Sequence, residues 1–270
     1  MENSLENVMI RIASMGHAVF AVMMIVLGTV GFLDPDLVSL WNPVSIHVPA
    51  HELLIHLIAL IAVAAGVGLL VQRMAAMAAS LLLATLSLWL LLLRLPNLFL
   101  EPVFVASWSV FPLVLMVAAA WVLYGWFASN WERKHLSFLR GKNGLRIARF
   151  LYGLCLIFFG IAHFVDVKDT VTLVPHWLPN HLFWAYFTGC AFLAAGLATL
   201  IGFCARLAVT LSALQLALFL FLVWIPIVAT GSREPFQWSE TILNAALCAG
   251  AWVMADSYRG TRWLAPLRPE

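Results

Sequence analysis

Histidines gather in two stretches of the sequence that flank long apolar runs. Six of the eight histidines belong to these stretches: His47, His51, His56, His163, His176 and His181. An imidazole titrates near neutral pH, so it can bind a metal, accept a proton or hydrogen-bond a quinone oxygen. The spacing contains no H-E-x-x-H, and His51 and His56 lie five residues apart, on different helix faces, so no metal site is predicted. Solvated loop histidines remain the simpler interpretation of the set.

His163 is the histidine best placed for chemistry. It follows Gly160 by three residues, so a second helix can approach closely beside the imidazole. In the last apolar run, Glu240, Asn244 and Cys248 recur every four residues and predict a polar stripe on one helix face. We predict that His163 and Glu240 are catalytic groups that exchange protons. Two alternatives stay open: a structural Glu–His tie, or a histidine bonded only to a backbone carbonyl.

Two segments rich in Pro, His and Trp precede apolar runs, at Trp41–His51 and Val174–His181. They predict short interfacial caps that either cover a pocket between helices or only connect spans. The predicted cofactor-binding residues are His163, Trp177, His181 and Asn244. The sequence holds no Gly-rich phosphate loop, no Ser-His-Asp set and no C-x-x-C-H motif, so the cofactor stays open, with quinone as the candidate.

The composition decides what kind of fold must position these residues. Hydrophobic residues make up 63% of the 270 and charged residues only 10%, which lipid accommodates and water does not. Continuous apolar runs favour helices over a barrel. We therefore predict an all-α integral membrane protein with eight transmembrane helices, near residues 12–33, 53–71, 75–95, 104–127, 148–165, 182–201, 206–227 and 238–256.

Basic residues predict the orientation of these helices. With both termini in the cytoplasm, twelve basic residues face inward and three face outward, namely Arg94, Lys168 and Arg233. Arg94 is expected to extend along the third span to the membrane surface. The net charge of +2 is small and scattered, which excludes a nucleic-acid-binding role on the sequence alone.

The two halves of the chain resemble each other. Pro49-Ala-His51 matches Pro179-Asn-His181, Ala64-Ala-Gly66 matches Ala194-Ala-Gly196, and the offset between all matches stays between 130 and 132 residues. An even number of spans per half predicts two parallel four-helix bundle repeats. The units are residues 1–129, a basic cytoplasmic linker 130–147, and residues 148–270. The first unit has Gly31 for His163 and Val110 for Glu240, so the site is expected in the second.

The second half resembles the DoxX-like family of bacterial membrane proteins. The resemblance rests on Phe159-Gly-Ile-Ala-His-Phe164, Val174-Pro-His-Trp-Leu-Pro179 and Phe183-Trp-Ala-Tyr-Phe-Thr-Gly189. Members are four-helix proteins; some are the membrane subunit of a thiosulfate:quinone oxidoreductase, and others partner oxidative-stress enzymes. The resemblance implies a bacterial inner-membrane location and a partner oxidoreductase.

Three functions follow from these observations. The first is a membrane component of a redox system, quinone-linked or docking a partner enzyme, with its site near the outer face of the second half. The second is a non-catalytic scaffold, favoured by the lack of a complete catalytic set. The third is a small-solute transporter, suggested by the repeat. Whether the chain is itself an enzyme, and whether it forms a homo-oligomer, stays open.

Overall fold

The computed structural model describes residues 12–41, 48, 50–127 and 141–264, and these are helical apart from short turns. His47, His135 and most of the predicted linker lie outside the described residues. The described part of the chain is thus all-helical, as the continuous apolar runs predict.

The first half contains four long helices joined by short elements. These are α1 (Met15–Leu33), the 3-10 turn η2 (Pro35–Leu37), α2 (His51–Leu70), α3 (Ala75–Trp89), the π-helical turn η3 (Leu90–Arg94), α4 (Asn97–Leu100) and α5 (Val103–Phe127).

The second half has a similar order of elements. These are α7 (Gly141–Val165), α8 (Val167–Leu173), α9 (His181–Ile201), α10 (Ala205–Phe219), the π-helical turn η5 (Leu220–Trp224), α11 (Ile225–Ala229) and α12 (Pro235–Asp256).

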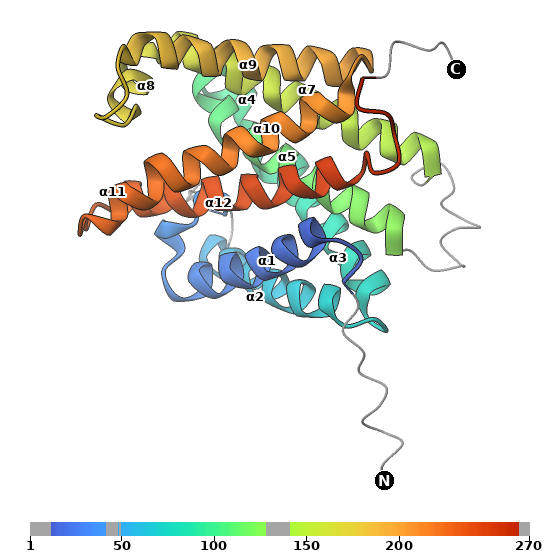
Figure 1. Cartoon of the computed structure of the whole chain (residues 1–270). Coiled ribbons are helices and arrows are strands. Elements are labelled where there is room, and N and C mark those ends of the chain that lie inside the picture. Colours follow the sequence, from blue (N-terminus) through green and yellow to red (C-terminus); the bar gives the residue numbers. More distant parts are fainter. Residues whose placement is uncertain (1–11, 42–47, 49, 128–140, 265–270) are drawn as a thin grey trace.

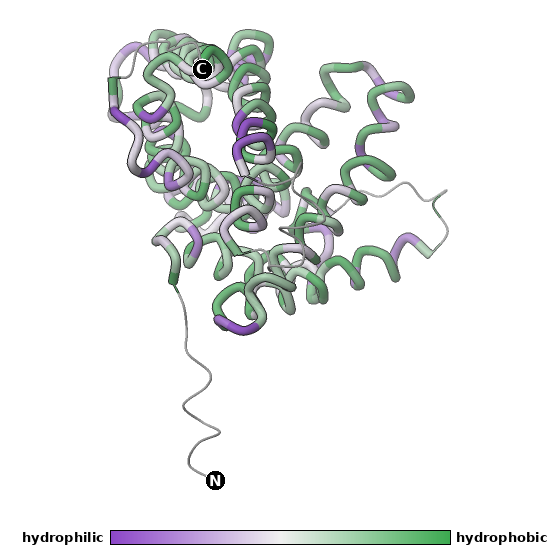
Figure 2. The backbone as a smooth tube through the Cα atoms, turned by 90° about the vertical axis from the view of Figure 1, so that its right-hand side faces the viewer, coloured by the Kyte–Doolittle hydropathy of each residue, from purple (hydrophilic) through white to green (hydrophobic). Residues whose placement is uncertain are grey.

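Seven helices in the described part of the chain are long and apolar enough to cross a membrane. They are α1, α2, α3 with its extension to Leu100, α5, α7, α9, and α10 with its extension to Ala229. The tube in Figure 2 is accordingly hydrophobic along most of its helical length. The protein is therefore a multi-pass membrane protein, and each of these seven helices coincides with a predicted span.

Successive long helices run in opposite directions between two ends of the molecule. We call the end where α7 stops and α8 lies the α8 face, and the opposite end, where α5 stops and α7 begins, the linker face. In Figure 1 the long helices run across the view, with α8 and α11 at the same end. This arrangement places Val165, His181 and Pro235 at the α8 face and Asp256 at the linker face.

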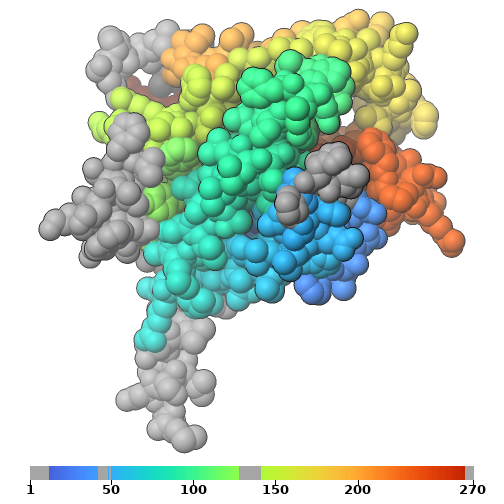
Figure 3. Space-filling model, turned by 180° about the vertical axis from the view of Figure 1, so that it is seen from behind, coloured from blue at the N-terminus to red at the C-terminus, as the bar shows by residue number. Residues whose placement is uncertain are grey.

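Helices α5 and α12 occupy the middle of the bundle. Helix α5 packs against α3 of its own half and α7 of the other, while α12 packs against α10 and α1; the two also contact each other. Phe111 of α5 stacks on Phe158 of α7 with ring centroids 4.5 Å apart. Seen from behind, the α3–α5 segment runs across the surface between the two halves (Figure 3). The halves therefore share one continuous core.

Glycine allows α7 and α9 to pack closely, as predicted for Gly160. A Cβ atom on Gly160 would lie 2.9 Å from the carbonyl oxygen of Gly189 and 2.7 Å from Cγ of Leu193. Contacts this short leave no room for a side chain, so the backbones approach each other directly.

The prediction that Arg94 extends to the membrane surface is wrong. Its side chain is only 1% exposed and donates hydrogen bonds to the carbonyl oxygens of Ser39 and Leu40, at 3.2 and 3.1 Å. The π-helical turn η3 directs Arg94 inward, where the segment after η2 supplies carbonyl acceptors. Burial is tolerated because the guanidinium finds these acceptors inside the protein.

Candidate functional site

A cavity of about 470 Å³ lies in the second half, between α7, α9, α10 and α12. Trp108 and Pro112 of α5 also line it, so the first half contributes one wall. Most of the lining is aliphatic or aromatic. Its polar side chains are Asp166 and Thr170 near the α8 face and His163, Thr188, Gln215, Glu240 and Asn244 on the long helices. A cavity of this size that is apolar with a few polar groups is typical of small-molecule sites.

His163 lines the cavity from the last turn of α7. Its Nδ1 atom lies 2.7 Å from the carbonyl oxygen of Phe159, one helical turn earlier, so Nδ1 carries a proton and donates it. Nε2 is then the nitrogen left to interact with a ligand. The ring stacks on Phe219, with centroids 5.8 Å apart, and meets Phe192 edge-on at 5.5 Å. These contacts fix the orientation of the imidazole.

Asn244 and Glu240 reach the same cavity from α12, one turn apart. Asn244 is 7% exposed, and its Oδ1 atom has no hydrogen-bond partner among the described residues. A buried polar atom without a partner costs about 1–3 kcal/mol. It therefore points to a ligand or water in the cavity.

The structural tie between His163 and Glu240, one of the two alternatives, is not formed: among the described residues no hydrogen bond or ion pair joins the two side chains. Both line the cavity from different helices. Each is therefore available to a molecule placed between them.

Gln215 and Thr188 supply a second polar position deeper in the bundle. Nε2 of Gln215 donates to the carbonyl oxygen of Thr188 at 3.0 Å. This bond leaves Oε1 of Gln215 as the acceptor available to the cavity. Neither residue was predicted, because a single Gln or Thr in an apolar run gives no pattern from which its partner helix can be inferred.

Part of the cavity wall also faces the lipid side of the helices. Leu211, Leu214 and Leu218 of α10 line the cavity and are 51%, 52% and 45% exposed. Phe187 of α9 does the same and is 51% exposed. The cavity therefore borders the outer surface of the bundle between α9 and α10, the surface that meets hydrocarbon in a membrane.

Two predicted cofactor residues lie elsewhere. Trp177 is 69% exposed at the α8 face, and the ring of His181 lies 6.2 Å from that of His176. Neither lines the cavity, although their neighbours Pro175 and Leu178 do. Of the two alternatives for the segment 174–180, a cap or a simple connection, the cap is favoured, because Val174, Pro175 and Leu178 line the cavity.

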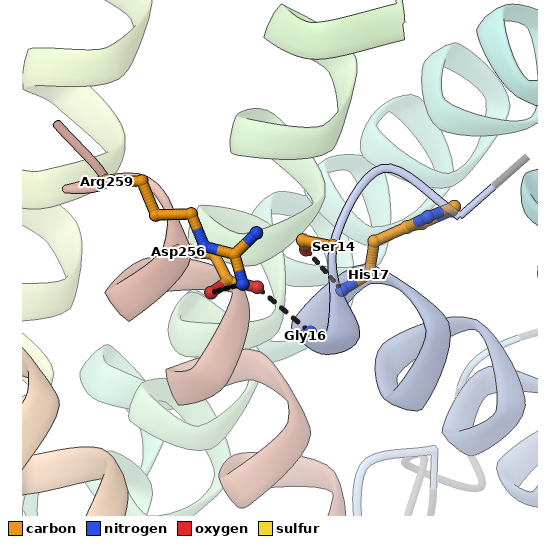
Figure 4. Close-up of polar contacts among 5 residues, drawn as sticks. All are labelled: Ser14, Gly16, His17, Asp256 and Arg259. Atoms are coloured by element: carbon orange, nitrogen blue, oxygen red, sulfur yellow. Dashed lines mark hydrogen bonds and ion pairs between the residues drawn. The ribbon is translucent and has the colours of Figure 1, made fainter.

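A separate group of polar contacts joins the start of α1 to the end of α12 at the linker face (Figure 4). The backbone N–H of Gly16 donates to Oδ2 of Asp256 at 2.9 Å, and Arg259 pairs with Asp256 at 2.8 Å. Ser14 caps α1 by accepting from the N–H of His17 at 3.0 Å. Because these groups hydrogen-bond or pair with one another, we interpret the cluster as a structural contact between α1 and α12.

Among the residues that the structure describes, no group of three or more His, Cys, Asp or Glu side chains could hold a metal ion. A comparison of the chain with protein-family models, curated proteins and solved structures found no match.

Proposed function

We propose that this chain is a membrane-embedded component of a redox system and that its cavity binds a quinone. One observation carries the proposal: His163, Glu240 and Asn244, which the sequence singled out separately, line one cavity, and Asn244 has a buried oxygen without a partner. Such a lining suits a largely apolar molecule with a few oxygen atoms.

The polar groups match the two states of a quinone. The oxidised ring accepts hydrogen bonds through its carbonyl oxygens, whereas the reduced ring donates them through its hydroxyls. The carboxamide of Asn244 offers both a donor and an acceptor, so it can bond either state. A bound quinone supplies a carrier for two electrons and two protons.

His163 and Glu240 are the proposed proton-exchanging groups. His163 holds a proton on Nδ1 through the Phe159 carbonyl, so Nε2 accepts or releases the proton that is exchanged. Glu240 lines the same cavity near the α8 face, where α12 begins. Electrons would come from, or go to, a partner oxidoreductase docked at the membrane.

The position of the cavity suits a ligand that dissolves in the bilayer. Its wall between α9 and α10 includes leucines that face lipid, so a quinone with a long apolar tail could enter sideways. The head group would enter the cavity and the tail would remain among the acyl chains.

We further propose that the chain is a duplicated, DoxX-like unit with eight spans. The helix bounds support this: α2 and α9 begin at His51 and His181, α3 and α10 at Ala75 and Ala205, and the π-helical turns at Leu90 and Leu220, each 130 residues apart. Helix α12 would be the eighth span; its 22 residues extend about 33 Å, enough for a hydrocarbon core of about 30 Å.

The same proposal sets the location and orientation. The chain would lie in a bacterial inner membrane with both termini in the cytoplasm, so that the α8 face and the cavity are near the outer side. The proposal allows either a partner oxidoreductase or a second copy of this chain as the neighbour in the membrane.

The test is quinone binding by purified protein in lipid nanodiscs, with electron transfer to quinone in isolated membranes as a second readout. We expect His163→Ala to weaken binding about tenfold, the equivalent of ~1.4 kcal/mol. The matched control is His56→Ala, because His56 makes the same bond to a backbone carbonyl one turn earlier, 2.8 Å to Glu52, but does not line the cavity. Protein that binds no quinone would overturn the proposal and favour a scaffold.

A further inference from the structure

The first half carries an apolar version of the cavity lining. At the offsets of the proposed repeat, the five polar lining residues of the long second-half helices have these counterparts: Gly31 for His163, Ile58 for Thr188, Thr85 for Gln215, Val110 for Glu240 and Val114 for Asn244. Asp166, in the turn after α7, has an aspartate as its counterpart, Asp34. Four of the five positions are therefore apolar, and only Thr85 keeps a hydroxyl.

In the first half, Trp41 packs beside the residue that the proposed repeat pairs with His163. Its indole is fully buried, at 0% exposure. A Cβ atom on Gly31 would lie 2.9 Å from Cδ1 of Trp41, so the indole touches the bare backbone of α1. On its other side the indole meets Trp89 edge-on, with ring centroids 6.2 Å apart. Trp89 corresponds to Phe219, which lines the second-half cavity.

The indole is held in place by the segment that carries it. Arg94 bonds the carbonyl oxygens of Ser39 and Leu40, the two residues before Trp41. Leu40 is itself 3% exposed. The first half thus contains a ring fixed between α1 and α3, at the place that His163 and Phe219 border in the second half.

We infer that Trp41 is a built-in substitute for the ring of the ligand, and that the second-half cavity therefore takes a flat ring system of two fused rings, the naphthoquinone class. This inference rests on the proposed quinone function and on the proposed repeat. It also implies one open ring site in each chain.

The residues that differ between the halves match the polar atoms of the two rings, the indole in the first half and the proposed naphthoquinone in the second. An indole has no oxygen atom and one donor, Nε1, which in Trp41 is buried without a hydrogen-bond partner among the described residues. The residues that the proposed repeat pairs with His163, Glu240 and Asn244 are Gly31, Val110 and Val114, which have no polar side chain. A naphthoquinone has two oxygen atoms, and His163, Glu240 and Asn244 offer polar groups at the same positions. Polar side chains thus occur in the half where the ring would need them.

The first experiment compares two quinones that carry the same single-isoprenoid tail, one a naphthoquinone and one a benzoquinone. Binding to the full chain in nanodiscs is measured by calorimetry. We expect the naphthoquinone to bind at least about tenfold more tightly, because two fused rings fill the space that the indole fills in the first half. Equal affinity or a preference for the benzoquinone would overturn this inference but leave the proposed function intact. Binding of neither ring would overturn both.

The second experiment opens the first-half site. Trp41→Gly removes the indole and should leave an apolar cavity that binds free indole, as engineered apolar cavities bind small aromatics. With the second-half cavity saturated by naphthoquinone, indole should raise the Tm of Trp41→Gly. Wild type and Trp41→Phe, which keeps a ring in the space, should not respond.

Failure of Trp41→Gly to respond to indole would contradict the assignment of Trp41 as a ring substitute. Trp41→Val serves if the glycine variant does not fold, since it retains part of the packing and still empties most of the ring site. The comparison of the two quinones uses only the wild-type chain, so it tests the inference whether or not either variant folds.

Discussion

Asn244 is a residue whose burial makes the empty protein less stable. Its Oδ1 atom is buried and has no hydrogen-bond partner among the described residues, whereas Val114 is the residue that the proposed repeat pairs with it. An unpartnered buried polar group costs about 1–3 kcal/mol, and natural proteins retain such costs mainly where function requires them. In the cavity lining, the unpartnered oxygen of Asn244 therefore indicates a position for a ligand or a water molecule.

Asn244→Val should stabilise the protein and weaken quinone binding together. We expect the free energy of unfolding of the quinone-free protein to rise by about 1 kcal/mol, because a valine leaves no unpartnered oxygen. Thermal unfolding in detergent, followed by binding in nanodiscs, measures both effects. The reciprocal control, Val114→Asn, should destabilise without improving binding. A valine variant that binds quinone as well as wild type would contradict the role of Asn244.

Arg94→Ala should destabilise the first half. It leaves the carbonyl oxygens of Ser39 and Leu40 without their donor, at a cost of about 1–3 kcal/mol. The measurement is the thermal midpoint together with protease cleavage between η2 and Trp41, which should increase. Arg73→Ala, at an exposed arginine on the linker face, is the control and should change neither. Unaltered cleavage in Arg94→Ala would show that these bonds do not hold the segment.

The structure places His163, Glu240 and Asn244 at one cavity, and their roles stay predictions. His163, Glu240 and Asn244 were identified because ionisable and amide groups are costly inside apolar runs. Trp177 and His181 were grouped with them because of composition, but composition does not determine which side chains of a connecting segment turn inward. The position of Arg94 was predicted wrongly for a related reason. Its acceptors are backbone carbonyl groups of a distant segment, and because every residue has such a carbonyl, the sequence does not show which ones Arg94 will meet.

At the scale of elements, the close contact between α7 and α9 sets one side of the cavity. Gly160→Ala should separate these helices, because the added Cβ would lie within 2.9 Å of the Gly189 carbonyl oxygen. Overpacking of this kind costs about 1–3 kcal/mol. The matched control is Gly125→Ala in α5, where a Cβ would meet nothing within 4 Å and should stabilise the helix by about 0.5–1 kcal/mol. Opposite signs in a thermal unfolding assay are the expected outcome, and destabilisation by both would contradict it.

Helix bounds were predictable because hydrophobic length is determined by the thickness of the membrane. The predicted span 104–127 corresponds to α5 (Val103–Phe127), and 53–71 corresponds to α2 (His51–Leu70). The π-helical turns η3 and η5 were not predicted. Each widens a helix shortly before a proline, Pro96 or Pro226, and the sequence marks the proline but not the hydrogen-bond pattern that precedes it.

At the scale of the whole molecule, the halves are more closely joined than two bundles lying side by side. Trp108 and Pro112 of α5 line the cavity of the second half. At the end of α12, Asp256 accepts a hydrogen bond from the backbone N–H of Gly16 and so caps the start of α1. The first half is thus part of the site as well as a packing partner. Expressing the second half alone would remove one wall of the cavity.

The orientation of the protein in the membrane determines on which side the proposed site would exchange protons. Lys142 and Lys168 are both exposed, Lys142 at the linker face and Lys168 at the α8 face. The proposed orientation places Lys142 in the cytoplasm and Lys168 outside. An amine reagent that cannot cross membranes should therefore modify Lys168 in intact spheroplasts and Lys142 in inverted vesicles, as read by peptide mass spectrometry.

Protein dissolved in detergent is the control, because both lysines should then react. If Lys142 reacts in spheroplasts and Lys168 in inverted vesicles, the orientation is the reverse of the proposed one. The proposed proton exchange would then take place on the cytoplasmic side, and the fold would be unaffected. Modification of both lysines from one side of sealed vesicles would be more serious. It would mean that α7 does not cross the bilayer between Lys142 and Lys168, and a cavity built on the far end of α7 would have no defined depth from which quinone could enter.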